Sequence, residues 1–405
     1  MTRMTRWTVW TLAFVTAMGA TAAFAQVELV VWHGYRGAEK AAFEKVAKMY
    51  SDQTQGVTVK TLAVPYDAYA DKVTAAVPRG KGPDVFIFAQ DRMGGWVEAG
   101  KTLEPLDFFL DDAITDRFLD TTLEAMTYQG TIWGLPLNYK VITMIYNKKL
   151  LSDPPKDTTE LVKVGKSLTD ASVGKYGLAY PYADFYYHAA LMNAFGGGVF
   201  DANGQPTLND PANVKSFELL MKWIDQDKFV PAEPSTALIT ALFNDGKAAM
   251  VFSGPWFLGE VSDSVDVGLA MLPKVVEAGG TPMKPWMTVE GVYIAEPSQH
   301  KDEAFDFITF LTGAEAGAIM ALEGGQTPAN TRVYDNPKVA NDPVLSAFRK
   351  QVEVAVPMPN VPEMTMMWSP ATTAMNATVR KSASPKAALD QAQKEVSERI
   401  SKLRK

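Results

Sequence analysis

Two charged residues, Asp91 and Arg92, directly follow an apolar run at 85–88 that is typical of a short buried strand. Polar side chains just beyond the carboxyl end of a strand lie where open α/β sheets bind ligands. A carboxylate and a guanidinium at that place can bind polar groups through charge-assisted hydrogen bonds. The alternative is a loop in which Asp91 caps the next helix and Arg92 pairs with it. Gly94-Gly95, which follows, predicts a tight backbone turn.

Further aromatic and charged residues occur at separate places in the chain. The stretch 182–188 combines tyrosines and a phenylalanine with Asp184 and a histidine, a mixture that favours a polar pocket over a purely apolar core. Trp256 follows the end of an apolar run at 248–252, and Trp368 begins a helical pattern. Lys140 interrupts a long apolar stretch at 137–147, where a lysine lies either on an exposed edge or in a cleft.

The elements that must position these residues alternate strands and helices. Strand patterns at 27–32 and 57–64 flank a helix from about Ala38, in which Phe43, Val46, Ala47 and Tyr50 form one apolar stripe. A second helix pattern at 66–76 precedes the run at 85–88. This order implies a mostly parallel sheet with helices on both faces. A break at Asp153-Pro154-Pro155 precedes a second series of strands and helices.

Length and composition limit the class of protein. A chain of 405 residues is too long for one ordinary core, which predicts two domains. A net charge of −7 with no basic stripe argues against a nucleic-acid-binding protein. The absence of cysteine excludes disulfides, thiol nucleophiles and thiolate metal sites. His33, His188 and His300 lack helical i,i+4 spacing, so a zinc site is not expected. We also expect no cofactor.

Residues 1–25 have the pattern of an export signal. Arg3 and Arg6 precede an apolar run at 7–20, and Ala23-Phe24-Ala25 has the small-x-small form of a cleavage site. The run is short for a membrane anchor, which needs about 20 residues. No cysteine follows the cleavage site, so a lipid anchor is not expected. We therefore expect a soluble mature chain that begins at Gln26 and lies in the periplasm.

Several short motifs occur in an order that is characteristic of one family. They are Gly82-Pro83-Asp84 with Asp91-Arg92-x-Gly94-Gly95, Gly134-Leu135-Pro136 with Tyr146-Asn147-Lys148, Phe243-Asn244-x-Gly246 with Gly254-Pro255-Trp256, and Pro359-Asn360-x-Pro362-x-Met364 followed by Trp368. With them the chain resembles, over nearly its full mature length, the periplasmic sugar-binding proteins of ABC importers, and most closely those that bind maltose and maltodextrins. Each motif alone is of moderate specificity, and their common order carries the resemblance.

The resemblance implies a fold and a function. The expected fold is a two-lobed α/β fold of the type II periplasmic binding proteins, in which each lobe is a mostly parallel sheet flanked by helices and the ligand cleft lies between the lobes. The expected lobes are 26–138 with 291–337 and 143–286 with 344–405, and the hinge crossings lie near 138–142, 286–291 and 337–344. The implied function is non-catalytic capture of a carbohydrate by hinge closure and its delivery to ABC permease subunits with their ATPase. We expect a monomer, and a chemoreceptor is a further candidate partner.

The sugar contacts of the family carry over to particular positions of this chain. They are Tyr35, Arg36, Phe88, Asp91, Arg92, Lys140, Asp184, Tyr186, Tyr187, Trp256, Trp368 and Thr372. The resemblance implies an acid–lysine pair in the maltose-binding protein at the place of Tyr35-Arg36, so this chain keeps the cation and lacks the acid. It also implies a glutamate at the place of Lys140 and an arginine at the place of Thr372. These departures leave sugar binding as the expectation but place maltose itself in question.

The residues themselves also suit a sugar. A pyranose presents apolar C–H faces, on which aromatic rings stack, and a rim of hydroxyls, to which charged groups bind strongly. The candidate faces are Trp256, Trp368, Tyr186 and Phe88, and the candidate rim groups are Asp91, Asp184, Arg92 and Lys140. A lysine can donate to hydroxyls but cannot accept from them. We therefore expect Lys140 to face the cleft near Asp184 or Asp91 and to invert the hydroxyl pattern that is read there.

Other functions remain open from the sequence. An exported glycoside hydrolase could use Asp91 and Asp184 as its carboxylate pair, which must lie about 5–9.5 Å apart. A two-lobed receptor for ferric ion or a polyamine could use Tyr186 and Tyr187, although iron would need clustered oxygen ligands. Among sugars, trehalose or sucrose is the alternative to a maltodextrin. The tryptophans favour a sugar over the other solutes.

Overall fold

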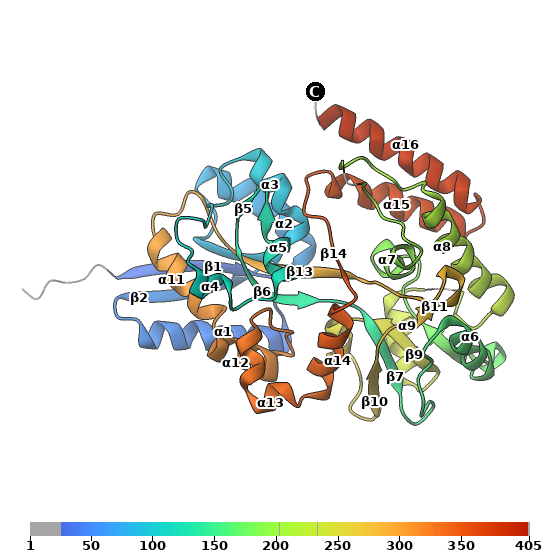
Figure 1. Ribbon diagram of the computed structural model, residues 1–405. Coiled ribbons are helices and arrows are strands. Elements are labelled where there is room, and N and C mark those ends of the chain that lie inside the picture. Colours follow the sequence, from blue (N-terminus) through green and yellow to red (C-terminus); the bar gives the residue numbers. More distant parts are fainter. Residues whose placement is uncertain (1–25, 202, 233, 404–405) are drawn as a thin grey trace, which may run out of the picture.

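The computed structural model describes residues 26–403 except 202 and 233, so the predicted signal peptide lies outside the described residues. Figure 1 shows two lobes, with strands β6 (Leu135–Lys140) and β13 (Trp286–Ile294) in the middle of the molecule between them. Each lobe contains its own sheet with helices packed against it. The architecture agrees with the predicted two-lobed α/β fold.

The first sheet has the strand order β14-β13-β3-β1-β2, with β6 paired to β13 beside this path. Alternate residues of β3 enter different cores: Val85 and Ile87 pack with residues of α1 and α11, whereas Phe86 and Phe88 pack with residues of α2 and α3. A strand that is covered on both faces needs a continuous apolar run. The remaining strands of this sheet are β1 (Val27–His33), β2 (Val57–Ala63), β3 (Val85–Ala89) and β14 (Val356–Pro357).

Helix α1 (Gly37–Gln53) buries the stripe expected from the sequence, which includes Phe43, Val46, Ala47 and Tyr50, and so confirms that prediction. The other helices of the first lobe surround its sheet or lie at its border with the second lobe (Figure 1). They are α2 (Tyr66–Ala76), α3 (Met93–Ala99), α4 (Asp112–Thr115), α5 (Asp120–Ala125), α11 (Lys301–Leu311), α12 (Ala314–Gly324), α13 (Pro337–Ala340) and α14 (Pro343–Val352). A short ribbon of β4 (Thr127–Tyr128) and β5 (Thr131–Ile132) lies between α5 and β6 in the sequence.

Within the described part of the chain, no single helix is long and apolar enough to cross a membrane. Helices α11 and α12 reach that length and apolar composition only together, and the pair is bent by 59°. Both helices place residues such as Phe307, Ile308 and Met320 in the core of the first lobe.

The second sheet has the order β10-β7-β9-β8. We expected mostly parallel pairing in each lobe, but here only β8 and β9 are parallel, while β7 is antiparallel to both β9 and β10. β7 enters this sheet directly from β6 of the first lobe through Val141 and Ile142, whereas β8 and β9 are joined by a long connection that contains helices, as parallel neighbours require. The strands of the second lobe are β7 (Thr143–Asn147), β8 (Tyr176–Ala179), β9 (Ala248–Ser253), β10 (Val267–Ala270), β11 (Lys274–Val275) and β12 (Thr281–Pro282).

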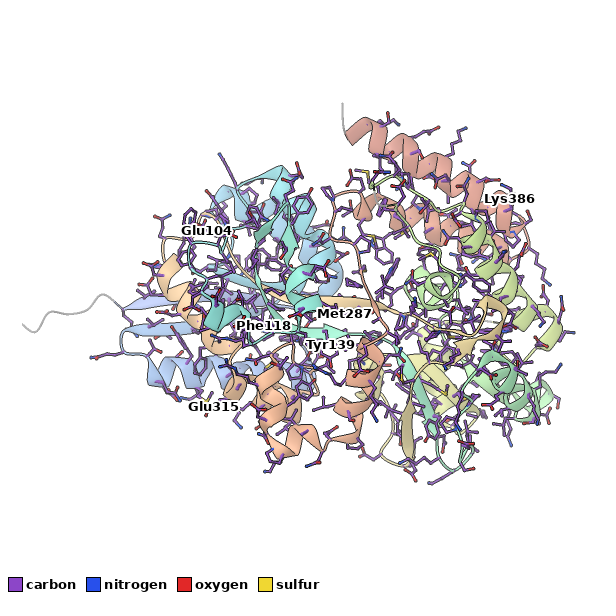
Figure 2. The ribbon with its side chains drawn as sticks, viewed as in Figure 1. Glu104, Phe118, Tyr139, Met287, Glu315 and Lys386 are labelled. Carbon is purple, nitrogen blue, oxygen red and sulfur yellow. The ribbon has the colours of Figure 1, made fainter. Side chains whose placement is uncertain are left out.

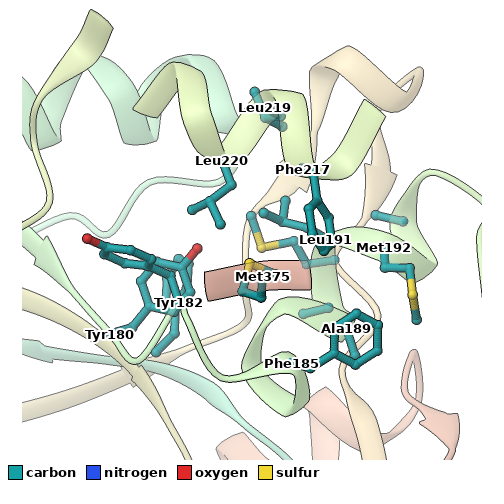
Figure 3. Close-up of a cluster of buried hydrophobic side chains, with 14 of the residues drawn as sticks. Tyr180, Tyr182, Phe185, Ala189, Leu191, Met192, Phe217, Leu219, Leu220 and Met375 are labelled. Carbon is teal, nitrogen blue, oxygen red and sulfur yellow. The ribbon is translucent and has the colours of Figure 1, made fainter. Parts of the chain in front are cut away.

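The core of the second lobe is rich in aromatic residues. Figure 3 shows Tyr180 and Tyr182 on one side of Met375 and Phe185 and Phe217 on the other, and all of these residues belong to one buried cluster. The Tyr182 hydroxyl donates to a backbone carbonyl at 2.7 Å. The aromatic stretch at 182–188 is therefore partly core, because the rings of Tyr182, Phe185 and His188 are fully buried. The helices of this lobe are α6 (Thr158–Ser167), α7 (Phe185–Ala194), α8 (Pro211–Lys222), α9 (Thr236–Asn244), α10 (Pro255–Leu258), α15 (Met364–Val379) and α16 (Pro385–Leu403).

A buried glutamine ties the strands together where the lobes meet. Figure 2 labels Tyr139 and Met287 in the middle of the molecule, and both side chains are buried. Gln90 Nε2 donates to the carbonyls of Met287 at 3.4 Å and Met358 at 3.1 Å, and Gln90 Oε1 accepts from the Val289 N–H at 2.8 Å. These bonds join the end of β3 to β13 and to the segment after β14.

The chain passes from the first sheet to the second where β6 ends at Lys140 and β7 begins at Thr143. Helix α14 also borders both sheets: Phe348 packs in a first-lobe cluster, and Gln351 Oε1 accepts from the Leu272 N–H at 2.8 Å, next to β10. The exact lobe boundaries and the hinge crossings near 138–142, 286–291 and 337–344 stay predictions.

Gly94-Gly95 does not form the expected tight turn, because both glycines lie inside α3. A Cβ atom at Gly94 would lie 2.3 Å from the Asn360 carbonyl oxygen, to which the Gly94 N–H donates at 2.9 Å. A Cβ atom at Gly95 would meet nothing within 4 Å. The first glycine is therefore required for the close approach of the segment before α15, and the second is not.

This contrast predicts opposite effects of the same substitution at adjacent positions. Gly94→Ala should lower the free energy of unfolding by about 1–3 kcal/mol, because the added methyl group overpacks against backbone. Gly95→Ala should be neutral or stabilise by up to about 1 kcal/mol, because alanine suits a helix better than glycine. Urea unfolding of the two variants measures the difference, and equal effects would contradict this account of the motif.

Candidate ligand-binding site

A cavity of about 360 Å³ lies between the lobes. The first lobe contributes the loop after β1, the start of α1 and parts of α2, β3, β6 and β13, and the second contributes α7, α10 and α15. The lining residues are Gly34, Tyr35, Arg36, Glu39, Tyr69, Ile87, Phe88, Ala89, Asp91, Lys140, Tyr186, Trp256, Thr288, Glu290, Met358 and Trp368. The predicted site residues that meet here are Tyr35, Arg36, Phe88, Asp91, Lys140, Tyr186, Trp256 and Trp368.

The second lobe supplies a wall of aromatic rings. Tyr186 in the first turn of α7 and Trp256 in α10 have ring centroids 6.1 Å apart. The Trp256 indole N–H donates to the Tyr187 hydroxyl at 3.2 Å, which holds the indole in place. Trp368 on α15 packs edge-to-face against Trp286 with 5.6 Å between centroids. Half-buried rings held in this way present apolar surface to the cavity.

The motif Gly254-Pro255-Trp256 has a steric explanation. A Cβ atom at Gly254 would lie 2.2 Å from Cζ3 of the Trp256 ring, so only glycine lets the indole fold back over its own turn. Pro255 occupies the first position of α10, where its missing N–H costs no hydrogen bond. The motif therefore fixes the indole against the wall of the cavity.

Asp91 lies at the carboxyl end of β3, where the sequence placed it, and it is 7% exposed. The Trp368 indole of the other lobe donates a hydrogen bond to its carboxylate. The Arg92 Nε atom lies 3.5 Å from Asp91 Oδ2. Burial raises the pKa of Asp91 from 3.8 to about 6, although Arg92 and the hydrogen bonds oppose that rise. The carboxylate is thus an acceptor shared between the lobes.

Lys140 faces the cavity, as predicted, but its partners are not Asp184 or Asp91. Its Nζ atom lies 2.9 Å from Glu290 Oε1 and 3.7 Å from Glu39 Oε1. Burial lowers the pKa of Lys140, but attraction to Glu290 and Glu39 outweighs burial and raises it overall. The expected aspartates were the wrong partners because the facing strand β13, which the motifs did not cover, supplies the nearest acid.

The pairing of β6 with β13 explains why these charges meet. Lys140 is directly opposite Thr288, and Glu290, two residues further along β13, lies on the same face of the sheet. The register shifts between Glu290 and Gly291, beside Pro136, which cannot donate a ladder hydrogen bond. Bulges of this kind re-aim side chains next to functional sites.

Other predicted residues do not line the cavity. Arg92 pairs with Asp91, and Tyr187 holds Trp256. Asp184 is exposed and caps α7 by accepting from the Tyr186 N–H at 2.9 Å. Thr372 lies one turn after Trp368 on α15. Direct contact of these four side chains with a ligand stays a prediction, and the Asp91–Asp184 carboxylate pair of the hydrolase alternative is not assembled in this cavity.

Sequence reasoning missed two acids in the cavity, Glu39 and Glu290. Glu39 lies three residues after Arg36 in the first turn of α1, and it brings a carboxylate to the cavity beside Tyr35 and Arg36. Helical spacing could have revealed it. Glu290 interrupts an apolar strand in the way that drew attention to Lys140, and the same signal could have identified it. Tyr69, Thr288 and Met358 carried no comparable signal.

The arrangement suits a neutral polyhydroxylated ligand. The aromatic wall can cover apolar C–H faces, while carboxylates and cations on the first lobe can bind hydroxyls. Among the described residues, no group of three or more His, Asp or Glu side chains is placed to hold a metal ion.

Comparison with known proteins identifies the family of this chain and relatives that bind oligosaccharides. A family profile described as bacterial extracellular solute-binding protein matches residues 45–347, and the chain belongs to that family. It is 34% identical over 345 residues to a maltotriose-binding protein of Pyrococcus abyssi, covering 84% of this chain and 75% of that one. It is 27% identical to a galactooligosaccharide-binding protein of Bacillus subtilis, covering 90% of this chain and 87% of the relative.

A solved structure supports the fold. The crystal structure of a cyclo/maltodextrin-binding protein complexed with maltotetraose superposes with a TM-score of 0.82 at 30% sequence identity, covering 92% of this chain and 97% of the other. This likeness confirms the two-lobed α/β fold of type II. As a member of an extracellular solute-binding family, the protein acts outside the cytoplasm.

Because the pKa of Asp91 is raised, Asp91→Asn should increase the free energy of unfolding by an amount that depends on pH. The folded state binds this proton more tightly than the unfolded state, so the wild type loses stability as pH rises from 3.8 to about 6. The full cost is present above that range and can reach about 3 kcal/mol. Asparagine cannot ionise, so the variant should gain free energy of unfolding relative to wild type at pH 7, and this advantage should disappear by pH 4.

Urea unfolding of the ligand-free protein from pH 4 to pH 8 measures this difference. Asp116→Asn, which changes an exposed aspartate of the first lobe, is the matched control. A difference between Asp91→Asn and wild type that stays constant over this pH range would contradict the assignment.

Proposed function

We propose that this protein captures a maltodextrin-like oligosaccharide outside the cytoplasm by hinge closure and delivers it to an ABC permease with its ATPase. The observation that carries the proposal is the cavity between the lobes. It combines an aromatic wall from the second lobe with carboxylates and cations from the first. Only a ligand that bridges both walls can use both sets of groups, and such a ligand favours the closed form by its differential affinity.

Maltodextrins are favoured among oligosaccharides for two reasons. Flat aromatic surfaces such as Trp256 and Trp368 suit the faces of glucose rings. The similarity to a maltotriose-binding protein supports the same ligand class. An alternative oligosaccharide is supported by the similarity to a galactooligosaccharide-binding protein and by Lys140, where the resemblance to the maltose-binding protein implies a glutamate. Trehalose and sucrose are the disaccharide alternatives.

The remaining parts of the proposal concern location and partners. The pattern at 1–25 supports a cleavable signal peptide and a periplasmic product, and the absence of cysteine argues against a lipid anchor. We propose that the protein works as a monomeric receptor, not as an enzyme, and uses no cofactor. A chemoreceptor is a second candidate partner.

The aromatic wall gives the direct test of ligand class. Maltotriose should change the tryptophan fluorescence of the wild type and raise its melting temperature, because a ligand that binds only the folded state stabilises it. Trp256→Ala should weaken maltotriose binding by about 30-fold or more, as expected for a buried aromatic anchor. Titration followed by fluorescence and calorimetry measures both effects, with galactooligosaccharides, trehalose and sucrose in the same panel.

Trp133→Ala is the matched control, because Trp133 is another half-buried tryptophan but lies outside the cavity lining. It should bind maltotriose as the wild type does. Binding of galactooligosaccharide alone would redirect the proposal to that sugar. A Trp256→Ala variant with wild-type affinity would show that the aromatic wall is not the binding surface.

Hinge closure predicts a change in shape. A saturating oligosaccharide should lower the radius of gyration measured by small-angle X-ray scattering, because it draws the lobes together. Trp256→Ala at the same sugar concentration should change less. An unchanged radius with a sugar that calorimetry shows to be bound would rule out capture by closure.

A further inference from the structure

The first-lobe wall of the cavity contains a linked cluster of polar side chains, Tyr35, Glu39, Lys140 and Glu290. Glu290 Oε1 pairs with Lys140, and Glu290 Oε2 accepts from the Tyr35 hydroxyl at 3.0 Å. Asn138 Nδ2 in turn donates to that hydroxyl at 3.2 Å. Glu290 and Lys140 are 13% and 17% exposed at their side chains, so both are held in a mostly buried setting while still lining the cavity.

The cluster contains more acceptors than donors. One lysine cation faces two carboxylates, which leaves a net charge of −1 on this part of the wall. Gln326 Nε2 donates to Glu39 Oε1 at 2.6 Å, the same oxygen that faces Lys140. Within the described part of the chain, Glu39 Oε2 accepts no hydrogen bond. Each carboxylate oxygen can accept more than one bond, so unused acceptor capacity faces the cavity.

Hydroxyl pairs are the groups that fit this surface. Each hydroxyl of a vicinal diol can donate to a carboxylate and accept from a cation, and a chain of α-1,4-linked glucose leaves the 2- and 3-hydroxyls of every unit free. A neutral sugar suits this cluster better than an anionic one, because its two carboxylates would repel a further negative charge. The side chains are also held in place before binding, since Lys140, Tyr35 and Gln326 fix the acids. Preorganised acceptors bind more tightly than mobile ones.

We infer that Glu290 and Glu39 are the hydroxyl acceptors of the first lobe, that Lys140 positions them, and that together they set which neutral oligosaccharide is retained. This inference rests on the proposed function and names the specificity-determining residues of the same site. The acids that face Lys140 come from the facing strand β13 and from the start of α1, and Lys140 lies within ion-pair distance of both.

The test is isothermal titration calorimetry with maltotriose on Glu290→Gln and Glu39→Gln. Each variant should bind about 10- to 100-fold more weakly, because a neutral amide replaces a charged acceptor. Glu104→Gln is the matched control: Glu104 pairs with Lys301 at 2.6 Å in a similarly shielded setting, and Figure 2 labels it in the first lobe away from Tyr139 and Met287. The control should retain wild-type affinity.

A modified ligand shows whether Glu290 touches the sugar or only stabilises the wall of the cavity. Maltotriose methylated at its 2- and 3-hydroxyls should bind the wild type more weakly than maltotriose does. This loss should be smaller in Glu290→Gln, because the two changes remove the same interaction and cannot be additive. If the losses add instead, Glu290 supports the fold of the wall without touching the sugar, and the inference fails.

Exchanging the charges of Lys140 and Glu290 gives a further test, which does not require the Glu290→Gln variant to fold. Lys140→Glu places a third carboxylate beside Glu39 and Glu290, so it should abolish maltotriose binding through repulsion between like charges. Lys140→Glu combined with Glu290→Lys restores the original set of charges and should recover measurable binding. Wild-type affinity in Lys140→Glu would place Lys140 outside the recognition surface and overturn the inference.

The outcomes also separate this inference from the proposed function. If the wild type binds maltotriose and Glu290→Gln, Glu39→Gln and Glu104→Gln all bind within about threefold of it, the inference is wrong and the function stands. If the wild type binds no oligosaccharide of the panel, both are wrong.

Discussion

The antiparallel pairing of β6 with β13 is the interaction on which the rest of the structure depends. These two strands belong to the first sheet, yet the chain continues from β6 directly into β7 of the second. Their register also decides which side chains share a face, so the pairing brings Lys140 beside Glu290 in the wall of the cavity. The pairing therefore fixes the strand from which the chain enters the second lobe, and it builds the polar part of the site.

The buried charges of this site carry an energetic cost. Moving an ion pair out of water is expensive, and its attraction offsets that cost only when further hydrogen bonds satisfy the remaining groups. Here Glu290 has both Lys140 and Tyr35 as partners, and Tyr35 has Asn138. Burial of Asp91 carries the same kind of cost, because it disfavours the charged carboxylate and raises its pKa. A site that keeps such groups in spite of their cost is typical of function rather than of stability.

The two lobes contribute different chemistry to the cavity. The second lobe offers rings held by their own neighbours, such as Trp256 folded over Gly254 and bonded to Tyr187. The first lobe offers charges on strand ends and at the start of α1. The indole of Trp368 donates to Asp91 across the junction, so one side chain takes part in both the aromatic and the polar wall. A sugar has apolar faces and a polar rim, so a cavity with one aromatic wall and one charged wall can bind both parts.

The sequence by itself determined the family, the two-lobed α/β fold and most of the aromatic wall. Runs such as 85–88 and the stripe of α1 depend on local periodicity, and motifs such as Gly254-Pro255-Trp256 depend on contacts within a few residues, so both can be read along the chain. Only the tertiary structure decided the partners of Lys140, the helical place of Gly94 and the role of Asp184 as a cap. Each depends on which distant segment lies opposite: β13 beside β6, the Asn360 segment against α3, or the start of α7 relative to the cavity. Strand register and close packing fix these relations, and neither is expressed in local residue spacing.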